Sequence, residues 1–182
     1  MLTCVNRRAA PGANNNLMAA IAHVLADGRS VTLRPVTVQD EAAERRFFAR
    51  LSPRTRELRF DHWGDAPDNA LAHFYTHVDH RAHEAFVCEH AGEIVGEARY
   101  VAHRDGTGAE FAVVVADDWR HTGVAQRLMR ALIEAARSRG LRSLAGLVRC
   151  DNSAMLRFVK RFGFDSEPVP AQPATVRVVK RL

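Results

Sequence analysis

The stretch EFAVVVADDWRHTGVAQRLMRALIEAARSRG, residues 110–140, joins two different hydrophobic patterns through one short turn. Its first part, 113–116, is rich in β-branched valine, which favours a strand. In its second part, Val124, Leu128 and Leu132 recur at the spacing of one helix face. The stretch therefore predicts a strand, a turn and an amphipathic helix in direct succession.

The turn between these two elements has an unusual charge for the start of a helix. Helix N-termini favour acidic residues, because their unpaired N–H groups carry partial positive charge. The turn instead contains Arg120, the protonatable His121, Thr122 and Gly123, and the glycine lets the backbone approach a ligand closely. This pattern predicts a phosphate group bound at the helix N-terminus. A tight turn with a solvated arginine is the alternative, and the turn alone leaves both open.

Length and composition narrow the classes of protein that can contain this turn. A chain of 182 residues, 47% of them hydrophobic, is large enough for one domain with its own core. The cysteines Cys4, Cys88 and Cys150 are odd in number and form no close pair, which indicates neither a disulfide framework nor a cysteine-based zinc site. We therefore expect a cytoplasmic protein, and the absence of a long apolar segment predicts no membrane partner.

The formal net charge of +5 favours an anionic partner, either a nucleotide cofactor, an acidic protein or nucleic acid. The basic residues are scattered rather than interleaved with aromatic residues, which make up only 7% of the chain. Platforms on which bases could stack are therefore poorly supported, and nucleic acid is not a predicted partner.

Periodicity along the rest of the chain predicts one domain with a mixed sheet. Residues 1–28 form a lead, in which an apolar stripe at Leu17, Ile21 and Val24 predicts a short helix, and residues 29–182 form a single domain. Asp40 is the expected cap of the first helix of that domain. The expected order is a strand, three helices, three strands, a helix, a strand, a helix and a strand, at 30–35, 40–51, 52–60, 68–79, 84–90, 93–102, 109–116, 123–139, 141–149, 155–163 and 174–182. With no repeat or internal linker, this order indicates a single mixed α/β sheet.

Two motifs in this arrangement resemble a known family. Arg120-x-x-Gly123-x-Ala125, at the strand-to-helix turn, resembles the (Q/R)xxGx(G/A) pyrophosphate loop of the GNAT superfamily of acyl-CoA-dependent N-acyltransferases. CDNSAMLRFVKRFGF, residues 150–164, resembles its second signature, in which an Asn opens the next helix and Gly-Phe ends it. The resemblance covers residues 29–182. It implies a mostly antiparallel central sheet with flanking helices and a parallel strand pair splayed at the acyl-CoA site.

A narrower resemblance concerns two longer segments. LRPVTVQDEAAERRFFARLSPRTRELRF, residues 33–60, and GTGAEFAVVVADDWRHTGVAQRLM, residues 106–129, look like the GNAT domain of bacterial protein lysine acetyltransferases. This resemblance implies acetyl transfer from acetyl-CoA to a primary amine, and a protein lysine is the predicted acceptor.

The resemblance also implies which residues meet acetyl-CoA. The backbone of the strand would pair with the pantetheine arm, and one of its N–H groups, at Val115 or a neighbour, would stabilise the oxyanion. Amides of the turn would hold the pyrophosphate. The predicted set is Val113, Val114, Val115, Arg120, His121, Thr122, Gly123, Val124, Ala125 and Asn152. Core burial of the valines is compatible with this role, because backbone contacts leave side chains free to pack.

Acetylation of an amine requires a group that removes its proton. A lysine ammonium has a pKa of about 10.4, so a base or a water relay is needed at neutral pH. Glu110 is the predicted base, at the strand position where the resembling lysine acetyltransferases have a catalytic glutamate. A surface carboxylate is the plainer interpretation of Glu110, and Glu97 is the substitute base. The tyrosine acid of many GNAT enzymes corresponds to Val159 here, so water or another group would protonate the thiolate.

A cluster of histidines raises the question of a metal. His73 and His77 have the i, i+4 spacing of zinc ligands, with His80 and His83 close behind. No glutamate follows His73 in the metalloprotease pattern and no cysteine joins the cluster, so we predict no metal.

Two other functions of the chain stay open at this point. The acceptor can be a small-molecule amine, or the domain can be a CoA-binding sensor without catalysis. The helices within 41–60 and 68–77, with the loop between them that contains Trp63, should flank the amine channel. The cations of RTRELRF, residues 54–60, suit an acidic protein surface. The oligomeric state is left open between monomer and dimer.

Overall fold

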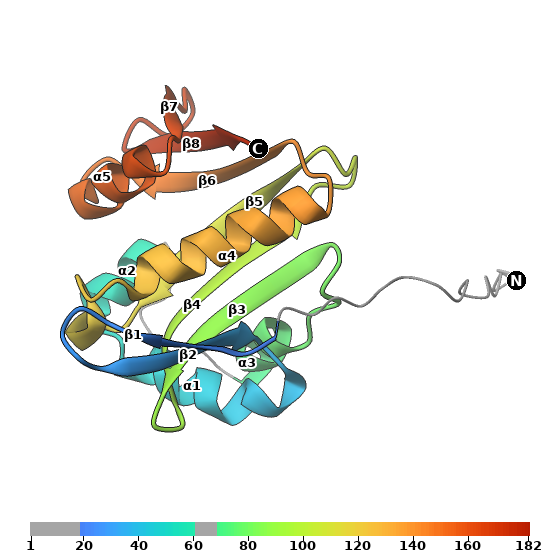
Figure 1. The fold of residues 1–182 in the computed structure, drawn as a ribbon. Helices are drawn as coiled ribbons and strands as arrows, with labels where there is room; N and C mark the ends of the chain where they lie inside the picture. The colour runs from blue at the N-terminus through green and yellow to red at the C-terminus, as the bar shows by residue number, and fades with distance from the viewer. Residues whose placement is uncertain (1–18, 61–68) are drawn as a thin grey trace, which may run out of the picture.

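The computed structural model describes residues 19–60 and 69–182, which fold around one eight-stranded sheet (Figure 1). The strand order is β1-β2-β3-β4-β5-β6-β8-β7, and every neighbouring pair is antiparallel except β5 and β6. The strands are β1 (Ile21–Val24), β2 (Ser30–Pro35), β3 (His83–His90), β4 (Glu93–Ala102), β5 (Gly108–Val115), β6 (Ser143–Arg149), β7 (Asp165–Pro168) and β8 (Thr175–Arg181). The predicted mixed, mostly antiparallel sheet is confirmed.

Helices cover both faces of the sheet. They are α1 (Glu41–Arg50), α2 (Pro53–Phe60), α3 (Asn69–Thr76), α4 (Val124–Ser138) and α5 (Ser153–Arg161), with short 3₁₀ turns η1 (Val38–Asp40) and η2 (Asp117–Trp119). On β4, the charge of Glu97 acts on Glu44 of α1. The neighbouring Gly96 faces Val124 of α4, and successive strand residues point to opposite faces, so α1 and α4 cover opposite sides. None of the described helices is long and apolar enough to cross a membrane.

Strands β3, β4 and β5 form the meander that the sequence predicts. Ala91 and Gly92 join β3 to β4, and their φ angles of 48° and 81° are typical of a two-residue hairpin turn. The turn sets the pairs next to it, and a register shift between Cys88 and Glu89 then places Cys88 opposite Gly96, the residue that faces α4.

Strands β5 and β6 are parallel over three residue pairs only, from Gly108 opposite Ser143 to Glu110 opposite Ala145. Beyond these pairs β5 stays bonded to β4 as far as Val115, while β6 stays bonded to β8. Each strand therefore keeps one partner while a gap opens between them, and the two diverge in Figure 1. The predicted splayed parallel pair is present.

Gly146 lies directly after the last of these pairs. A Cβ atom on this residue would lie 3.1 Å from the backbone oxygen of Phe111 and 3.0 Å from its ring. Because these distances leave no room for a side chain, glycine lets β6 lie close against β5 just before the gap begins.

The helix prediction based on the stripe at Leu17, Ile21 and Val24 is wrong for the described residues of that stripe. Ile21–Val24 is a strand, paired with β2 from Ile21 opposite Leu33 to Val24 opposite Ser30. The reason is tertiary, because the free edge of β2 supplies backbone partners that a short isolated helix lacks. A turn at Gly28, with φ of 84°, brings the segment back along β2.

Two smaller features also differ from the expectation. Asp40 does not cap α1 with its side chain; its carboxylate instead accepts hydrogen bonds from the backbone N–H of Thr37 at 2.7 Å and from Arg34. Thr37 and Asp40 form a capping box one turn earlier, at η1. Strand β7 was not predicted, because its polar, exposed sequence DSEP becomes a strand only through pairing with β8.

Glu44 of α1 is a carboxyl group buried against the sheet. Its side chain is fully buried, and neither oxygen has a hydrogen-bond partner within the described part of the chain. Burial raises the pKa of Glu44 well above its usual value, and Glu97 and Asp40 raise it further, against the opposing charges of Arg99 and Arg59. These surroundings favour the neutral acid.

Glu44→Gln should therefore stabilise the protein increasingly as the pH rises. The unfolded chain releases this proton above its ordinary pKa of 4.5, whereas the folded chain keeps it up to the raised pKa. Wild type thus loses free energy of unfolding between these two pH values, by up to about 1.4 kcal/mol per pH unit. Glutamine cannot ionise, so the advantage of the variant should be small near pH 4.5 and grow above it.

Urea unfolding of both proteins at three pH values, about 4.5, 6 and 7.5, measures this difference. An advantage that is the same at all three pH values would contradict a buried neutral acid.

Candidate functional site

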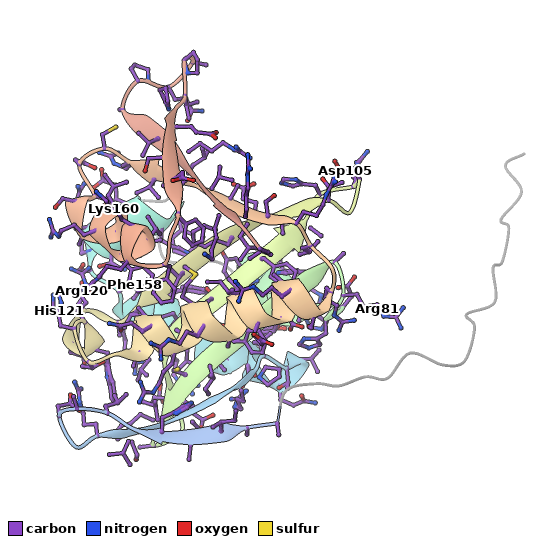
Figure 2. The ribbon with its side chains drawn as sticks, turned by 45° about the horizontal axis from the view of Figure 1, so that its top comes forward. Arg81, Asp105, Arg120, His121, Phe158 and Lys160 are labelled. Atoms are coloured by element: carbon purple, nitrogen blue, oxygen red, sulfur yellow. The ribbon has the colours of Figure 1, made fainter. Side chains whose placement is uncertain are left out.

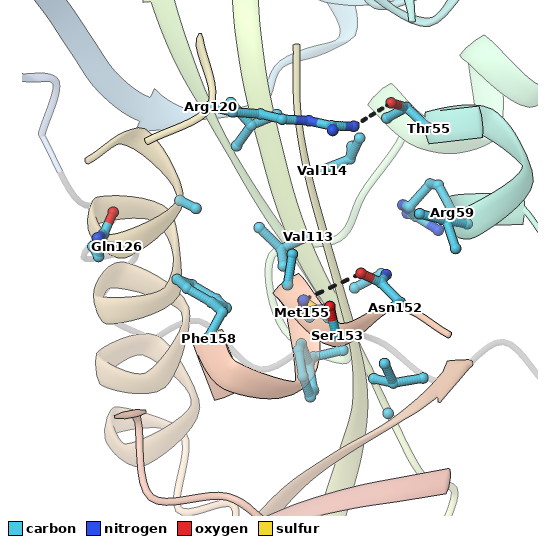
Figure 3. Close-up of a pocket in the computed structure, with 18 of the residues that line it drawn as sticks. Thr55, Arg59, Val113, Val114, Arg120, Gln126, Asn152, Ser153, Met155 and Phe158 are labelled. Carbon is cyan, nitrogen blue, oxygen red and sulfur yellow. Dashed lines mark hydrogen bonds between the residues drawn. The ribbon is translucent and has the colours of Figure 1, made fainter. Parts of the chain in front are cut away.

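A cavity of about 490 Å³ opens where β5 and β6 separate (Figure 3). Its walls come from α2, β5, the loop before α4, the first turn of α4, β6 and the start of α5. The side chains that line it include Thr55, Leu58, Arg59, Val113, Val115, Trp119, His121, Gln126, Leu147, Asn152, Met155 and Phe158. The cavity thus extends the gap in the sheet toward the first turns of α4 and α5.

The backbone of β5 presents an unpaired edge to this cavity. Ala116, directly after β5, donates its N–H to the carbonyl of Val95 in β4, at 2.9 Å. Peptide groups alternate in direction along a strand, so the N–H groups of Val113 and Val115 point away from β4 and toward the gap. β6 does not pair with this part of β5. An extended ligand can therefore hydrogen-bond to β5 as an added strand.

The loop before α4 leaves the N-terminus of that helix free. His121 and Gly123 both have positive φ angles, 63° and 100°. Gly123 is the N-cap residue, no side chain caps the helix, and no acidic residue lies in its first turn. The first N–H groups of α4 are therefore available to an anion, whose charge the helix dipole also favours. Figure 2 shows Arg120 and His121 at this end of α4, near Phe158.

Arg120 connects this loop to α2 rather than pointing freely into the cavity. Its Nη2 donates to Thr55 Oγ1 at 2.6 Å and forms an ion pair with Asp117 Oδ1 at 2.8 Å (Figure 3). Asp117 also accepts hydrogen bonds from the N–H of Ser52 and the hydroxyl of Thr55, at 2.9 and 2.7 Å. The loop before α4 and the start of α2 are therefore held as one unit.

A ring of four ion pairs joins α2 to the loop before α5. Arg54 pairs with Glu57 and Asp151, each at 2.8 Å, and Arg149 pairs with Asp151 at 2.8 Å and Glu57 at 3.3 Å. Hydrogen bonds from Arg149 and Arg54 hold the pKa of Asp151 well below its usual range. Because all four side chains are partly exposed, the ring contributes little to stability, but it fixes the rim of the cavity at Arg54 and Asp151.

Most of the residues that the sequence predicts for cofactor contact line this cavity. They are Val113, Val114, Val115, Arg120, His121, Gly123, Ala125 and Asn152. The other two have side chains turned elsewhere: Thr122 donates to the Trp119 carbonyl at 2.7 Å, and Val124 is fully buried. Only their backbone groups can therefore meet a ligand.

Asn152 has the capping role that its position predicts. Its side-chain oxygen accepts the N–H of Met155 at 3.1 Å, the second dashed line of Figure 3. Val159, one turn further along α5, is almost fully buried in the core. No proton donor reaches the cavity from that position.

Glu110 lies beside the main cavity rather than in its wall. Its exposed side chain lines a smaller cavity of about 190 Å³, and Gly146 and Leu147 border both cavities. None of the described residues forms a hydrogen bond or an ion pair with its carboxylate. Glu97 of β4 lies opposite Val114, four strand positions along from Glu110 on the same face, and it is fully buried and paired with Arg99. Of the two carboxylates predicted as a base, only that of Glu110 is exposed.

The wall made by α2 contains cavity residues that the sequence does not identify individually. Leu58 and Arg59 both line the cavity, whereas the sequence predicts only that their helix flanks the amine channel. Trp63 lies outside the described residues. Met155 and Phe158 come from the apolar stripe of α5, a signal that the sequence contains but that equally fits core packing.

The predicted histidine cluster separates into different surroundings. His80 hydrogen-bonds with Glu84, and His83 accepts from Arg99, since burial and then the Arg99 charge lower the pKa of His83 to about 4. His73 and His77 lie close to Glu41, and one ligand atom from each of these three lies within 4.8 Å of the others. The prediction of no metal stays a prediction.

Comparison with known proteins agrees with this geometry. The family model described as "Acetyltransferase (GNAT) family" matches residues 45–164. An acetyltransferase of Pseudomonas aeruginosa is 35% identical over 162 residues, 87% of this chain and 86% of the relative. The L-methionine sulfoximine/L-methionine sulfone acetyltransferase of the same organism is 32% identical over 111 residues, 57% of this chain and 64% of the relative. The GNAT domain of S. lividans PAT superposes with a TM-score of 0.82 at 26% identity, over 90% of this chain and 97% of that one.

Gly123→Ala should weaken the binding of coenzyme A more than it weakens the fold. A residue other than glycine at a φ of 100° costs about 1–2 kcal/mol, and the loop can relieve this strain by turning its N–H groups away from the cavity. Gly28→Ala is a matched control, because Gly28 also has a positive φ, 84°, with no atom within 4 Å of an added Cβ.

Calorimetric titration with coenzyme A and thermal unfolding of both variants separate the two effects. Both variants should lose similar stability, and only Gly123→Ala should lose affinity. Equal affinity in the two variants would show that the loop backbone does not hold the ligand.

Proposed function

The chain belongs to the GNAT family of acetyltransferases, which use acetyl-CoA, and we propose that it acetylates a lysine side chain of a protein, with Glu110 as the general base. The observation that carries this proposal is the exposed carboxylate of Glu110, at the last residue pair of β5 and β6 and beside the cleft. Exposure matters, because the base must be reachable by an amine from outside.

In this proposal acetyl-CoA lies in the cavity between β5 and β6. The N–H groups of Val113 and Val115 bind the pantetheine arm, and backbone amides from His121 to Ala125 hold the pyrophosphate. The free N-terminus of α4 and the unpaired edge of β5 support this orientation. The volume of about 490 Å³ is also within the usual range for ligand pockets.

The chemistry then needs three contributions from the chain. Glu110 takes the proton of the amine as the amine nitrogen bonds to the thioester carbon. The N–H of Val115 stabilises the negative oxygen of the tetrahedral intermediate. The carbon–sulfur bond breaks, and water protonates the thiolate, since the position of the tyrosine acid found in many GNAT enzymes is the buried Val159. Burial raises the pKa of the Cys88 thiol to about 12, which supports direct transfer without an acylated enzyme.

A protein acceptor is supported by the charge beside the cleft. Arg54 and Arg59 of α2 line the cavity, and Arg56 lies on the same helix. Cations there favour acidic surfaces over polyamines, which carry only positive charge. The resemblance of residues 33–60 and 106–129 to protein lysine acetyltransferases points the same way.

A small-molecule amine is the second candidate. The observation in its favour is the likeness to a relative named for acetylating L-methionine sulfoximine and L-methionine sulfone, at 32% identity. That likeness covers 57% of this chain, so the acceptor is a question for experiment.

Glu110→Gln should abolish most turnover without changing the binding of acetyl-CoA. Glutamine keeps the shape of the side chain but cannot accept the proton of the amine, so kcat should fall by about 100-fold or more. Thiol release from acetyl-CoA, with native and denatured bacterial proteins and with polyamines as acceptors, measures turnover, and calorimetry measures binding.

Glu134→Gln is the matched control, because Glu134 is an exposed carboxylate on α4 outside both cavities. It should leave turnover unchanged. Binding of acetyl-CoA with no thiol release from wild type with any acceptor would replace the enzyme by a binding module. Faster turnover of polyamines than of any protein would exclude the protein lysine.

A further inference from the structure

Arg59 of α2 is a buried cation with an incomplete set of partners. Its side chain is 12% exposed, and its Nε and Nη2 atoms are buried without a hydrogen bond. Within the part of the chain that the structure describes, its ion pair is with Oε2 of Glu97, which lies 3.7 Å from Nη2, too far for a hydrogen bond. A buried guanidinium of this kind is costly unless a further group pairs with it.

The neighbouring Arg99 is saturated, in contrast to Arg59. It forms an ion pair with Glu97 through Nε, donates from Nη2 to the Tyr75 carbonyl at 3.0 Å, and contacts His83 Nε2 from Nη1 at 3.0 Å. Glu97 is therefore already neutralised by Arg99 through its other oxygen. It cannot fully balance Arg59 as well.

The charges in this buried cluster do not cancel. Among the described residues, Glu97 is the carboxylate that lies against both cations, Arg59 and Arg99. Glu44 does not supply a second negative charge, because its buried oxygens have no hydrogen bond and burial favours its neutral form. The cluster formed by Glu44, Arg59, Glu97 and Arg99 thus has one positive charge in excess.

The excess charge borders the proposed active site. Arg59 lines the main cavity, and Figure 3 shows it on the α2 wall, across the pocket from Gln126 of α4. Its guanidinium lies over the rings of Phe60 and Tyr75, at 5.1 and 5.5 Å, which hold it in place. With Nε and Nη2 sealed, Nη1 is the nitrogen through which the group meets the cavity.

Arg59 and Glu110 are close enough for one acceptor molecule to contact both, with its amine at Glu110 and an anionic group at Arg59. Glu97, which Arg59 contacts, is opposite Val114 on β5, four residues after Glu110 on the same face. Four residues of extended strand span about 14 Å, and the arginine and glutamate side chains each cover part of it. An amine at Glu110 and an anion at Arg59 therefore belong to one residue or to two neighbouring residues.

We propose that Arg59 binds a carboxylate of the acceptor, so that the enzyme selects amines that have a carboxylate close by. This inference rests on the proposed function. A carboxylate supplies the missing negative charge, and one of its oxygens can accept a charge-assisted hydrogen bond from Nη1. Two acceptors have this chemistry, namely a lysine with an aspartate or glutamate beside it in a peptide, and a free amino acid.

The test compares matched acceptors that differ only in the carboxylate. One arm uses peptides with the sequence Asp-Lys or Asn-Lys, and the other uses free amino acids beside the amines that lack the carboxylate, such as phenylalanine and phenethylamine. Wild type should prefer the carboxylate member of a pair by about 10- to 100-fold in kcat/KM. The arm in which this preference appears shows whether the carboxylate belongs to a peptide or to a free amino acid.

Arg59→Met should remove the preference by lowering kcat/KM for the carboxylate member alone. Arg59→Lys keeps the charge and should retain part of the preference, which covers the case in which Arg59→Met does not fold. Arg46→Met is the control, because Arg46 is 53% exposed on α1 and pairs with Glu93 outside the cavity. Circular dichroism and acetyl-CoA binding verify that each variant is folded.

The outcomes separate this inference from the proposed function. Equal turnover of both members of every pair by wild type would overturn the role of Arg59 and leave the acetyltransferase intact. An equal loss for both members in the Arg59 variants would assign Arg59 a structural role only. No turnover of any acceptor, with acetyl-CoA bound, would overturn the proposed function and the inference together.

Discussion

The short parallel contact between β5 and β6 is the constraint on which the rest of the structure depends. Three residue pairs hold the two halves of the sheet together, and Gly146 permits close contact just where the pairing stops. Beyond that point each strand forms backbone hydrogen bonds with a neighbouring strand on one side only. The N–H and C=O groups on the other side of β5 must therefore bind water or a ligand. The cavity, the free N-terminus of α4 and the exposed carboxylate of Glu110 all lie around this separation. A sheet that paired along the whole length of β5 and β6 would have no gap for the cavity and no unpaired edge on β5.

Two walls of the cleft, the start of α2 and the loop before α4, are joined by hydrogen bonds. Asp117 accepts hydrogen bonds from Ser52 and Thr55 at the start of α2 and pairs with Arg120 of the loop before α4. The backbone that would hold a pyrophosphate and the helix that would face the acceptor are therefore parts of one hydrogen-bonded unit. Arg120 looks in the sequence like a free phosphate ligand, but in the fold it is first of all part of this connection. Its effect on a bound nucleotide can thus be indirect, through the position of Thr55.

The distribution of charge divides the site by chemistry. The α4 end combines a helix N-terminus with arginine and histidine, which suits the polyanionic end of acetyl-CoA. The opposite end has the exposed Glu110, which suits the arrival and deprotonation of an amine. Arg59 lies between them with a charge that its protein neighbours only partly balance. Under the proposed function, this arrangement would place the acyl donor on one side of β5 and leave the choice of acceptor to the α2 wall.

The sequence by itself determined the elements whose patterns are local. The alternation in β5, the stripe of α4 and the turn at Gly123 depend on neighbouring residues only, and two spaced motifs were enough to predict the family and the splayed pair. Tertiary structure decided what depends on distant partners. Ile21–Val24 is a strand because β2 has a free edge. Arg120 forms an ion pair with Asp117. The carboxylate of Glu110 is exposed, whereas that of Glu97 is buried beneath α1 and paired with Arg99. Hydrogen bonds and burial of this kind join residues far apart in the chain, and no local pattern records them.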